Sequence, residues 1–110
     1  MGSEIERSIV GIRSRIGRGT RIRDSLILGA DYYESLKVLD EAREKGLPPL
    51  GIGEDCVIER AIVDKNTRVG RGVRLVNEAG VENADGDGYY IRDGIVIIPK
   101  GGVVPDGTTI

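Results

Sequence analysis

The side chains in this sequence that could do chemistry are mostly charged, because histidine is absent from all 110 residues. Without an imidazole, catalysis by histidine and zinc binding through histidine are excluded. Cys56 is the single cysteine, and its place two residues before Ile58 favours a small structural residue over a nucleophile. The carboxylate pairs Glu54–Asp55 and Asp85 with Asp87 fall at expected corners or loops. We therefore predict no catalytic residue, no metal site and no cofactor.

Arginine is concentrated in the first quarter of the chain, where two interpretations stay open. The residues could form a solvated outer face or a basic patch for a phosphorylated ligand; they are Arg7, Arg13, Arg15, Arg18, Arg21 and Arg23. The formal net charge of −2 predicts binding neither to nucleic acid nor to a membrane. The sequence shows no signal peptide and no long apolar run, and a single thiol suits a reducing compartment, so we expect a soluble intracellular protein.

The elements that must position these side chains are indicated by a repeat of six. Branched aliphatic residues recur at this spacing, at Val10, Ile16, Ile22 and Leu28. A helix or an alternating strand would give a different period. Small residues stand two positions before the first three, at Ser8, Ser14 and Thr20. Each hexad is then one short strand and one turn, so that three hexads of about 18 residues close a triangular coil, with the aliphatic residues pointing inward.

Residues 30–50 interrupt the repeat. Leu36, Val38, Leu39 and Ala42 have helical spacing, and Gly46 with Pro48–Pro49 forbids continuation. We predict a short helix from about Glu34 to Lys45, as an excursion from the coil stack. Tyr32 and Tyr33 are expected to pack this helix against the coils.

The hexads resume at residue 51, and they predict the rest of the fold. Ile52 and Ile58 are six apart, whereas Val63, Val69 and Leu75 follow one residue earlier in phase, which indicates a modified corner near residues 61–63. The acidic, Gly-rich residues 78–88 are predicted to be a loop, residues 89–99 a strand, and residues 103–110 a last partial coil.

Together these segments predict one mainly β domain over residues 1–110, a parallel β-helix of roughly four coils with one helical excursion. Residues 1–4 are interpreted as a start and a short cloning remnant outside the fold. Both ends of such a stack expose backbone edges. We therefore expect self-association through the ends or faces of the β-helix.

Three segments resemble a known family more specifically than a hexad does. SLILGADYYE, PPLGIGEDCVIERAIVDKNTRVG and GYYIRDGIVIIPKGGVVPDGTTI are similar to the C-terminal domain of glucose-1-phosphate adenylyltransferase, or ADP-glucose pyrophosphorylase, an enzyme of glycogen and starch biosynthesis. The resemblance implies a left-handed parallel β-helix, an exception to right-handed crossovers. It also implies tetramer assembly, an allosteric site for sugar phosphates, phosphoglycerate or phosphate, and a location in the cytoplasm or, for a plant-type enzyme, the plastid.

The resemblance also implies an anion site. Lys65 in DKN and Lys100 in IIPKGG match positions of activator-binding lysines, and a lysine is a compact charge for a phosphate or carboxylate. Pro99 departs from the family pattern before Lys100 and removes a backbone donor. The alternative is two solvated surface lysines. Asp64 and Asn66 are interpreted as turn residues.

Three functions follow as hypotheses. The catalytic nucleotidyltransferase domain of the family has no counterpart in this sequence, so the first is a regulatory and oligomerisation domain without enzyme activity. The second is an engineered or idealised β-helix scaffold without a ligand, which the regular RIGRGTRIR segment would fit. The third is an acyltransferase or a carbonic anhydrase built from hexapeptide repeats. Such enzymes rely on histidine, which this sequence lacks.

Overall fold

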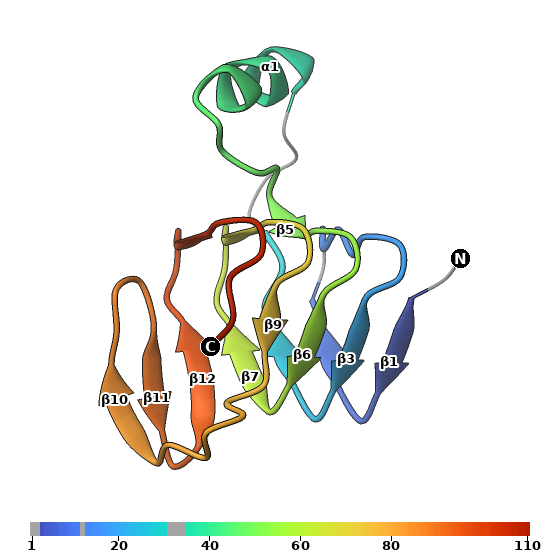
Figure 1. Cartoon of the computed structure of the whole chain (residues 1–110). Helices are drawn as coiled ribbons and strands as arrows, with labels where there is room; N and C mark the ends of the chain where they lie inside the picture. The colour runs from blue at the N-terminus through green and yellow to red at the C-terminus, as the bar shows by residue number, and fades with distance from the viewer. Residues whose placement is uncertain (1–2, 12, 31–34) are drawn as a thin grey trace.

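The strands in the described part of this chain form three sheets that the polypeptide visits in turn (Figure 1). The computed structural model describes residues 3–11, 13–30 and 35–110. The first sheet contains β1 (Glu4–Glu6), β3 (Arg21–Arg23), β6 (Val57–Glu59) and β9 (Arg74–Leu75). The second contains, in order, β10 (Asn83–Asp85), β11 (Tyr90–Arg92), β12 (Ile95–Ile98), β7 (Ala61–Val63), β4 (Leu26–Ile27) and β2 (Ile9–Val10). The third contains β13 (Val103–Val104), β8 (Arg68–Val69) and β5 (Gly51–Ile52). We call them sheets A, B and C.

The stacking is parallel and in register, except at one end of sheet B. Ile5 pairs with Ile22 and Ile58 with Leu75, in each case 17 positions on. A circuit of the three sheets without an excursion therefore takes 17 residues, one fewer than three full hexads.

The missing residue lies at the corner between sheets A and B, and it corrects one predicted core position. Ile27, five residues after Ile22, points inward with 3% exposure, whereas the predicted Leu28 is half-buried. Asp24 turns this corner in the left-handed region, with φ of 49°, and Arg60 does the same on the next layer. The modified corner predicted near residues 61–63 is confirmed, and the equivalent corner one layer earlier, at Asp24, is shortened in the same way.

The interior consists of aliphatic columns that run across the layers. Each column stacks one buried residue per layer, and together they are Ile22, Ile58 and Leu75 in sheet A, Ile27, Val63 and Ile98 in sheet B, and Ile52, Val69 and Val104 in sheet C. Burial of one such side chain stabilises the fold by about 1.5–3 kcal/mol. No single layer can bury these side chains alone, so each layer depends on its neighbours.

From the second layer onward, the small residues two positions before the aliphatic ones are also inside, whereas Ser8 and Ser14 of the first layer are half-buried. Thr20 donates its hydroxyl proton to the Gly53 carbonyl at 2.7 Å and accepts a hydrogen bond from the Cys56 N–H at 3.1 Å. The Cys56 thiol lies 3.1 Å from the Gly70 carbonyl. Burial raises the pKa of Cys56, so the thiol stays neutral near pH 7. These contacts support the structural interpretation of Cys56.

The first excursion contains the helix α1 (Leu36–Glu44), within the predicted range of residues 34–45. Two residues after the helix, Gly46 has a φ of 73°, and the Leu47 N–H bonds to the Ala42 carbonyl at 2.8 Å. Figure 1 shows α1 apart from the sheets, and Leu36 is 82% exposed. Tyr32 and Tyr33 lie outside the described residues. Within the described part, no helix has the length and apolarity needed to cross a membrane.

The second excursion differs from the predicted loop at residues 78–88, because β10 lies within it. Strands β10, β11 and β12 form an antiparallel ribbon, in which Ala84 pairs with Ile91 and Ile91 with Val96. Ala84, Ile91 and Val96 of this ribbon lie in or against the core, so the ribbon covers the last layer. Acidic and glycine residues around Ala84 hide this short alternation in the sequence. Asn77 fastens the base of the excursion through hydrogen bonds to Val81 and Gly94.

Residues 3 and 4, which the sequence analysis leaves outside the fold, take part in it. Glu4 begins β1 and pairs with Arg21, and the Ser3 hydroxyl bonds to the Gly17 carbonyl at 2.9 Å. The first layer therefore starts at the beginning of the described chain.

The aliphatic columns lead to a test of the core. Replacing Ile58 with Ala leaves a cavity between Ile22 and Leu75, and we expect a loss of about 2–5 kcal/mol in the free energy of unfolding. Ile9, which points outward and is 69% exposed, is the matched control, and Ile9→Ala should cost less than about 0.5 kcal/mol. Urea denaturation measures both. Equal losses in the two variants would contradict the inward orientation of Ile58.

Candidate functional site

Lys65 and Lys100 occupy the same corner of the prism on neighbouring layers. Strands β7 and β12 lead into the two turns in register, with Val63 opposite Ile98, and β8 and β13 leave them in register. The Gly101 N–H bonds to the Lys65 carbonyl at 2.9 Å, which stacks one turn on the other. Both lysines are exposed. The structure thus brings together the two residues that the sequence singled out.

The turn that presents Lys65 is held by its neighbours. Asp64 accepts a hydrogen bond from the Lys65 N–H at 2.7 Å, and the Thr67 hydroxyl donates to the Asp64 carbonyl at 2.7 Å. Asn66 has a φ of 59°, in the left-handed region. The interpretation of Asp64 and Asn66 as turn residues is therefore supported. The Asp64 carboxylate is fixed by the Lys65 backbone N–H.

Arg13 belongs to the same corner, which the sequence analysis did not foresee. Its Nε donates to the Ala30 carbonyl at 3.1 Å, and the Asn66 N–H donates to the carbonyl of Gly29 at 3.1 Å. Arg13, Gly29–Ala30, Lys65–Asn66 and Lys100–Gly101 therefore mark four successive layers of one edge. We call the side chains of Arg13, Lys65 and Lys100 the basic corner. The sequence analysis assumed coils of about 18 residues. A period of 17 residues would have placed Arg13 level with Ala30 and so on this corner.

The other N-terminal arginines lie on different faces, and several are neutralised. Arg7 forms a pair of bonds with Asp24, the closer at 2.6 Å, while Arg21 lies 3.6 Å from Glu4 and Arg23 lies 3.8 Å from Glu6. Their distribution supports a solvated outer face for this group over one continuous patch.

Arg15 has a different role, at the excursion that carries α1. Its guanidinium donates to the carbonyls of Leu50 and Pro49, at 2.9 and 3.4 Å. These bonds fasten the returning segment to the third side of the prism. Arg15 therefore acts as a tie between the first layer and the excursion.

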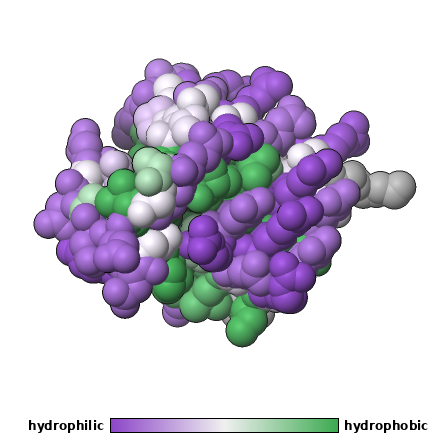
Figure 2. Space-filling model, turned by 60° about the horizontal axis from the view of Figure 1, so that its bottom comes forward, coloured by the Kyte–Doolittle hydropathy of each residue, from purple (hydrophilic) through white to green (hydrophobic). Residues whose placement is uncertain are grey.

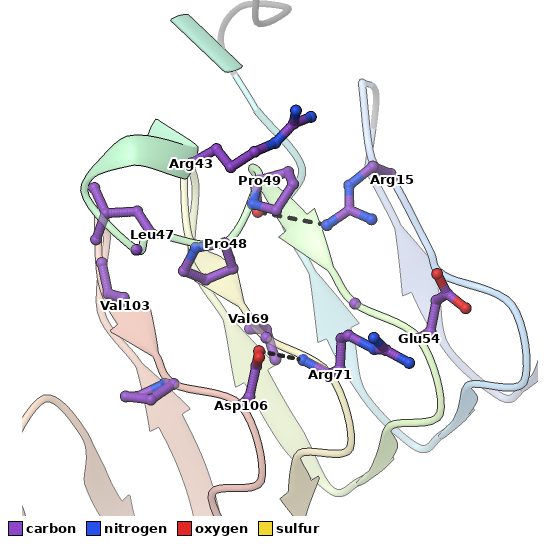
Figure 3. Close-up of a pocket in the computed structure, with 14 residues that line it drawn as sticks. Arg15, Arg43, Leu47, Pro48, Pro49, Glu54, Val69, Arg71, Val103 and Asp106 are labelled. Atoms are coloured by element: carbon purple, nitrogen blue, oxygen red, sulfur yellow. Dashed lines mark hydrogen bonds between the residues drawn. The ribbon is translucent and has the colours of Figure 1, made fainter. Parts of the chain in front are cut away.

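A groove lies beside this tie (Figure 3). It has a volume of about 710 Å³ and lies between the segment after α1 and sheet C. Leu47, Pro48, Val69 and Val103 supply apolar walls; the charged groups around it are Arg15, Arg43, Arg71, Glu54 and Asp106. Asp106 accepts a hydrogen bond from the Arg71 N–H at 2.8 Å. With three cations against two carboxylates, the groove has a weaker positive bias than the basic corner.

The chemistry that this geometry supports is binding. The Cys56 thiol is fully buried and neutral, so it cannot act as a nucleophile toward a bound ligand. The basic corner presents cations on a rigid edge, which suits recognition of an anion. The described residues bring no three metal-ligating side chains close enough to hold a metal ion.

The Arg7–Asp24 pair gives a pH-dependent test of the arginine assignment. The hydrogen bonds from Arg7 hold the pKa of Asp24 below its ordinary value of about 3.9. The stability that this carboxylate contributes is present above that value and is lost as the pH falls through the lower, folded-state pKa. In the Arg7→Gln variant, the pKa of Asp24 should rise toward 3.9, and the stability difference from the parent should shrink below about pH 4.

An NMR titration of the Asp24 carboxyl carbon measures this shift directly. Arg18→Gln, a change of the same type on another corner, is the control and should leave the titration of Asp24 unchanged. An Asp24 midpoint that does not respond to Arg7→Gln would refute the pairing.

The comparison with protein families agrees with this architecture. Residues 1–109 match the family model described as the GLGC left-handed parallel beta-helix domain. The match covers nearly the whole chain, supplies the left-handed sense of the winding, and concerns a β-helix domain rather than a nucleotidyltransferase domain. The resemblance stated from the sequence is confirmed: this chain belongs to the family of left-handed β-helix domains found at the C-terminus of glucose-1-phosphate adenylyltransferase.

Proposed function

We propose that this chain is a regulatory and assembly domain of about four β-helical coils, which binds an anionic effector at its basic corner. The effector class is a phosphorylated or carboxylated small molecule, such as phosphoglycerate, fructose bisphosphate or inorganic phosphate. The observation that carries the proposal is the stacking of Lys65 on Lys100 through the bond between Gly101 and the Lys65 carbonyl. Family membership supports the regulatory and assembly roles.

The spacing of the layers explains why a multivalent anion suits this edge. Adjacent strands of a sheet lie about 4.8 Å apart, so the backbones that carry Lys65 and Lys100 lie at about this separation. Two lysine side chains that start at this separation can both reach one anion, which would then gain two attractions. Arg13, two layers from Lys65, would engage a second anionic group on an elongated ligand.

The proposed role does not include catalysis by this chain alone. We expect no synthesis of ADP-glucose from it, because the matched family model describes the β-helix and the chemistry of the family lies in a nucleotidyltransferase domain. The effector would act by stabilising one arrangement of the assembly over another. The free energy by which the effector shifts the assembly equals the difference between its binding free energies for the two arrangements.

The proposal predicts loss of effector binding in the double variant Lys65→Ala/Lys100→Ala. Removal of both charges should weaken binding of phosphoglycerate, fructose bisphosphate or phosphate by about tenfold or more, since 1.4 kcal/mol corresponds to tenfold. Isothermal titration calorimetry at low and moderate salt measures this, and the affinity of the parent should fall as salt rises.

The remaining lysines provide a control of equal charge. Lys37→Ala/Lys45→Ala removes two exposed lysines from the region of α1 and should leave effector affinity unchanged. Equal weakening in both double variants would indicate a nonspecific charge effect and would overturn the proposed site. Absence of binding heat for all three anions with the parent chain would do the same.

A further inference from the structure

Four aspartates of this chain are each followed by glycine, and an Asp–Gly pair can rearrange without an enzyme. The glycine nitrogen attacks the side-chain carboxyl carbon of the aspartate, a C–N bond forms, and water leaves, which gives a cyclic imide. Water then opens the ring at the main-chain carbonyl carbon, so that the chain continues through the aspartate side chain as isoaspartate. No electrons are transferred, and the mass is unchanged. The four pairs are Asp85–Gly86, Asp87–Gly88, Asp93–Gly94 and Asp106–Gly107.

In three of the four pairs, the structure holds the glycine N–H in a hydrogen bond to a backbone carbonyl. The N–H has to leave that bond before its nitrogen can approach the carboxyl carbon, which costs free energy. The fold therefore slows the reaction at these three pairs. The bonds run from Gly86 to the Tyr89 carbonyl at 2.9 Å, from Gly94 to the Glu82 carbonyl at 3.0 Å, and from Gly107 to the Arg71 carbonyl at 2.8 Å.

Two of these three pairs are also held through the carboxylate. Asp85 accepts a hydrogen bond from the Arg92 guanidinium at 2.6 Å. Asp106 accepts a hydrogen bond from the Arg71 N–H at 2.8 Å. A carboxylate that turned toward the next amide would lose such a charge-assisted bond. The rearrangement at Asp85 and Asp106 is therefore opposed at both reacting groups.

The pair Asp87–Gly88 has neither restraint. Within the described part of the chain, no hydrogen bond or ion pair involves the Asp87 carboxylate or the Gly88 N–H. Both residues are exposed, and Gly88 has a φ of 80° with open space beside its Cα. They lie in the loop between β10 and β11, at the outer edge of the molecule (Figure 1). Figure 2, in which this end is at the left, shows a largely hydrophilic surface there.

We propose that Asp87–Gly88 is the site at which the folded chain forms isoaspartate, while the fold protects the other three Asp–Gly pairs. The inference does not depend on the effector site proposed above. The product carries an exposed α-carboxylate, which is the group that isoaspartate-specific methyltransferases methylate with S-adenosylmethionine. This loop is therefore the place where an enzyme of that class would act on the protein.

The loop can hold the product without a change in the ribbon. Isoaspartate adds one carbon atom to the main chain. The loop is closed by the bond between Gly86 and Tyr89, and Asp85 pairs with Tyr90 next to it. The additional atom falls inside this closed loop, so the register of β10 and β11 stays the same. Exposed loop tips tolerate such insertions, and we therefore expect the modified chain to remain folded.

Prolonged incubation of the parent chain near neutral pH, below its melting temperature, tests the site. Electron-transfer dissociation of proteolytic peptides identifies isoaspartate at each position, because it cleaves the Cα–Cβ bond that has entered the main chain. We expect isoaspartate to form at Asp87 about fivefold or more faster than at each other pair, since about 1 kcal/mol for one hydrogen bond corresponds to this factor. In guanidinium the four rates should agree within about threefold, because the unfolded chain holds none of the glycine amides.

Asp87→Glu tests the chemistry, with Asp93→Glu as the matched control. Glutamate keeps the charge but would have to form a larger and less favourable ring. Total isoaspartate is measured with an isoaspartate-specific methyltransferase and labelled S-adenosylmethionine. The total should fall by about twofold or more in Asp87→Glu and by less than about a quarter in Asp93→Glu, if each protected pair reacts about fivefold more slowly. Thermal melting followed by circular dichroism shows whether both variants are folded.

Three outcomes in the parent chain would overturn the inference. These are equal accumulation of isoaspartate at all four pairs of the folded chain, faster formation at any other pair than at Asp87, and absence of isoaspartate at Asp87 in the folded chain when the unfolded chain forms it. Each is read from the parent chain, so the test does not depend on the folding of a variant.

Discussion

The constraint on which the rest of the structure depends is that no layer of this prism can bury its own side chains. An isolated circuit would expose Ile52, Ile58 and Val63 on both sides, so the aliphatic columns exist only where layers stack. Stacking requires identical backbone paths at each corner, because each layer bonds to the next through its main chain. This explains why residues in the left-handed region recur at equivalent corners.

The same requirement places glycine where backbones approach closely. Gly17, Gly53 and Gly70 follow the inward residues of sheet C, and a Cβ on Gly53 would overlap the carbonyl of Gly70. Pro105 takes the equivalent position on the last layer, and the carboxylate of the next residue, Asp106, accepts a hydrogen bond from the Arg71 N–H. The last layer has no further layer against it at this position, so a side chain fits there, whereas the inner layers require glycine. The corner geometry, in turn, fixes the backbone that carries Lys65 and Lys100.

The hexad predicted the sheets, the inward residues and the first excursion, because burial of Ile22, Ile52 and Ile58 imposes a strong period on the sequence. It misassigned Leu28, because a corner in the left-handed region shortens one side by a residue, and no local signal distinguishes Asp24 from other turn residues. It also missed the strand at residues 83–85. Only three residues pair there, and their alternation is dominated by acidic and glycine neighbours.

The candidate site was predictable to a different degree. Lys65 and Lys100 were identified only through the family resemblance. The second excursion lies between them in the sequence, so the repeat alone could not show that their two turns stack. Arg13 requires both the 17-residue circuit and the length of the first excursion before it can be placed beside them. The crowding of arginine left a basic patch open beside a solvated outer face, and the winding distributes consecutive arginines over three faces. Proximity in the sequence is therefore a poor guide to proximity on this surface.

The two ends of the prism are finished differently, and this has a consequence for how the molecule would open. The antiparallel ribbon of β10 and β11 lies over the last layer, whereas in the first layer Ile5 is 46% exposed. In a one-dimensional array, a terminal unit has a single neighbour and separates at a lower free-energy cost than an internal one. Fraying should therefore start in β1 and β2 and travel inward, so that backbone amides exchange with solvent fastest in the N-terminal circuit and slowest beneath the ribbon.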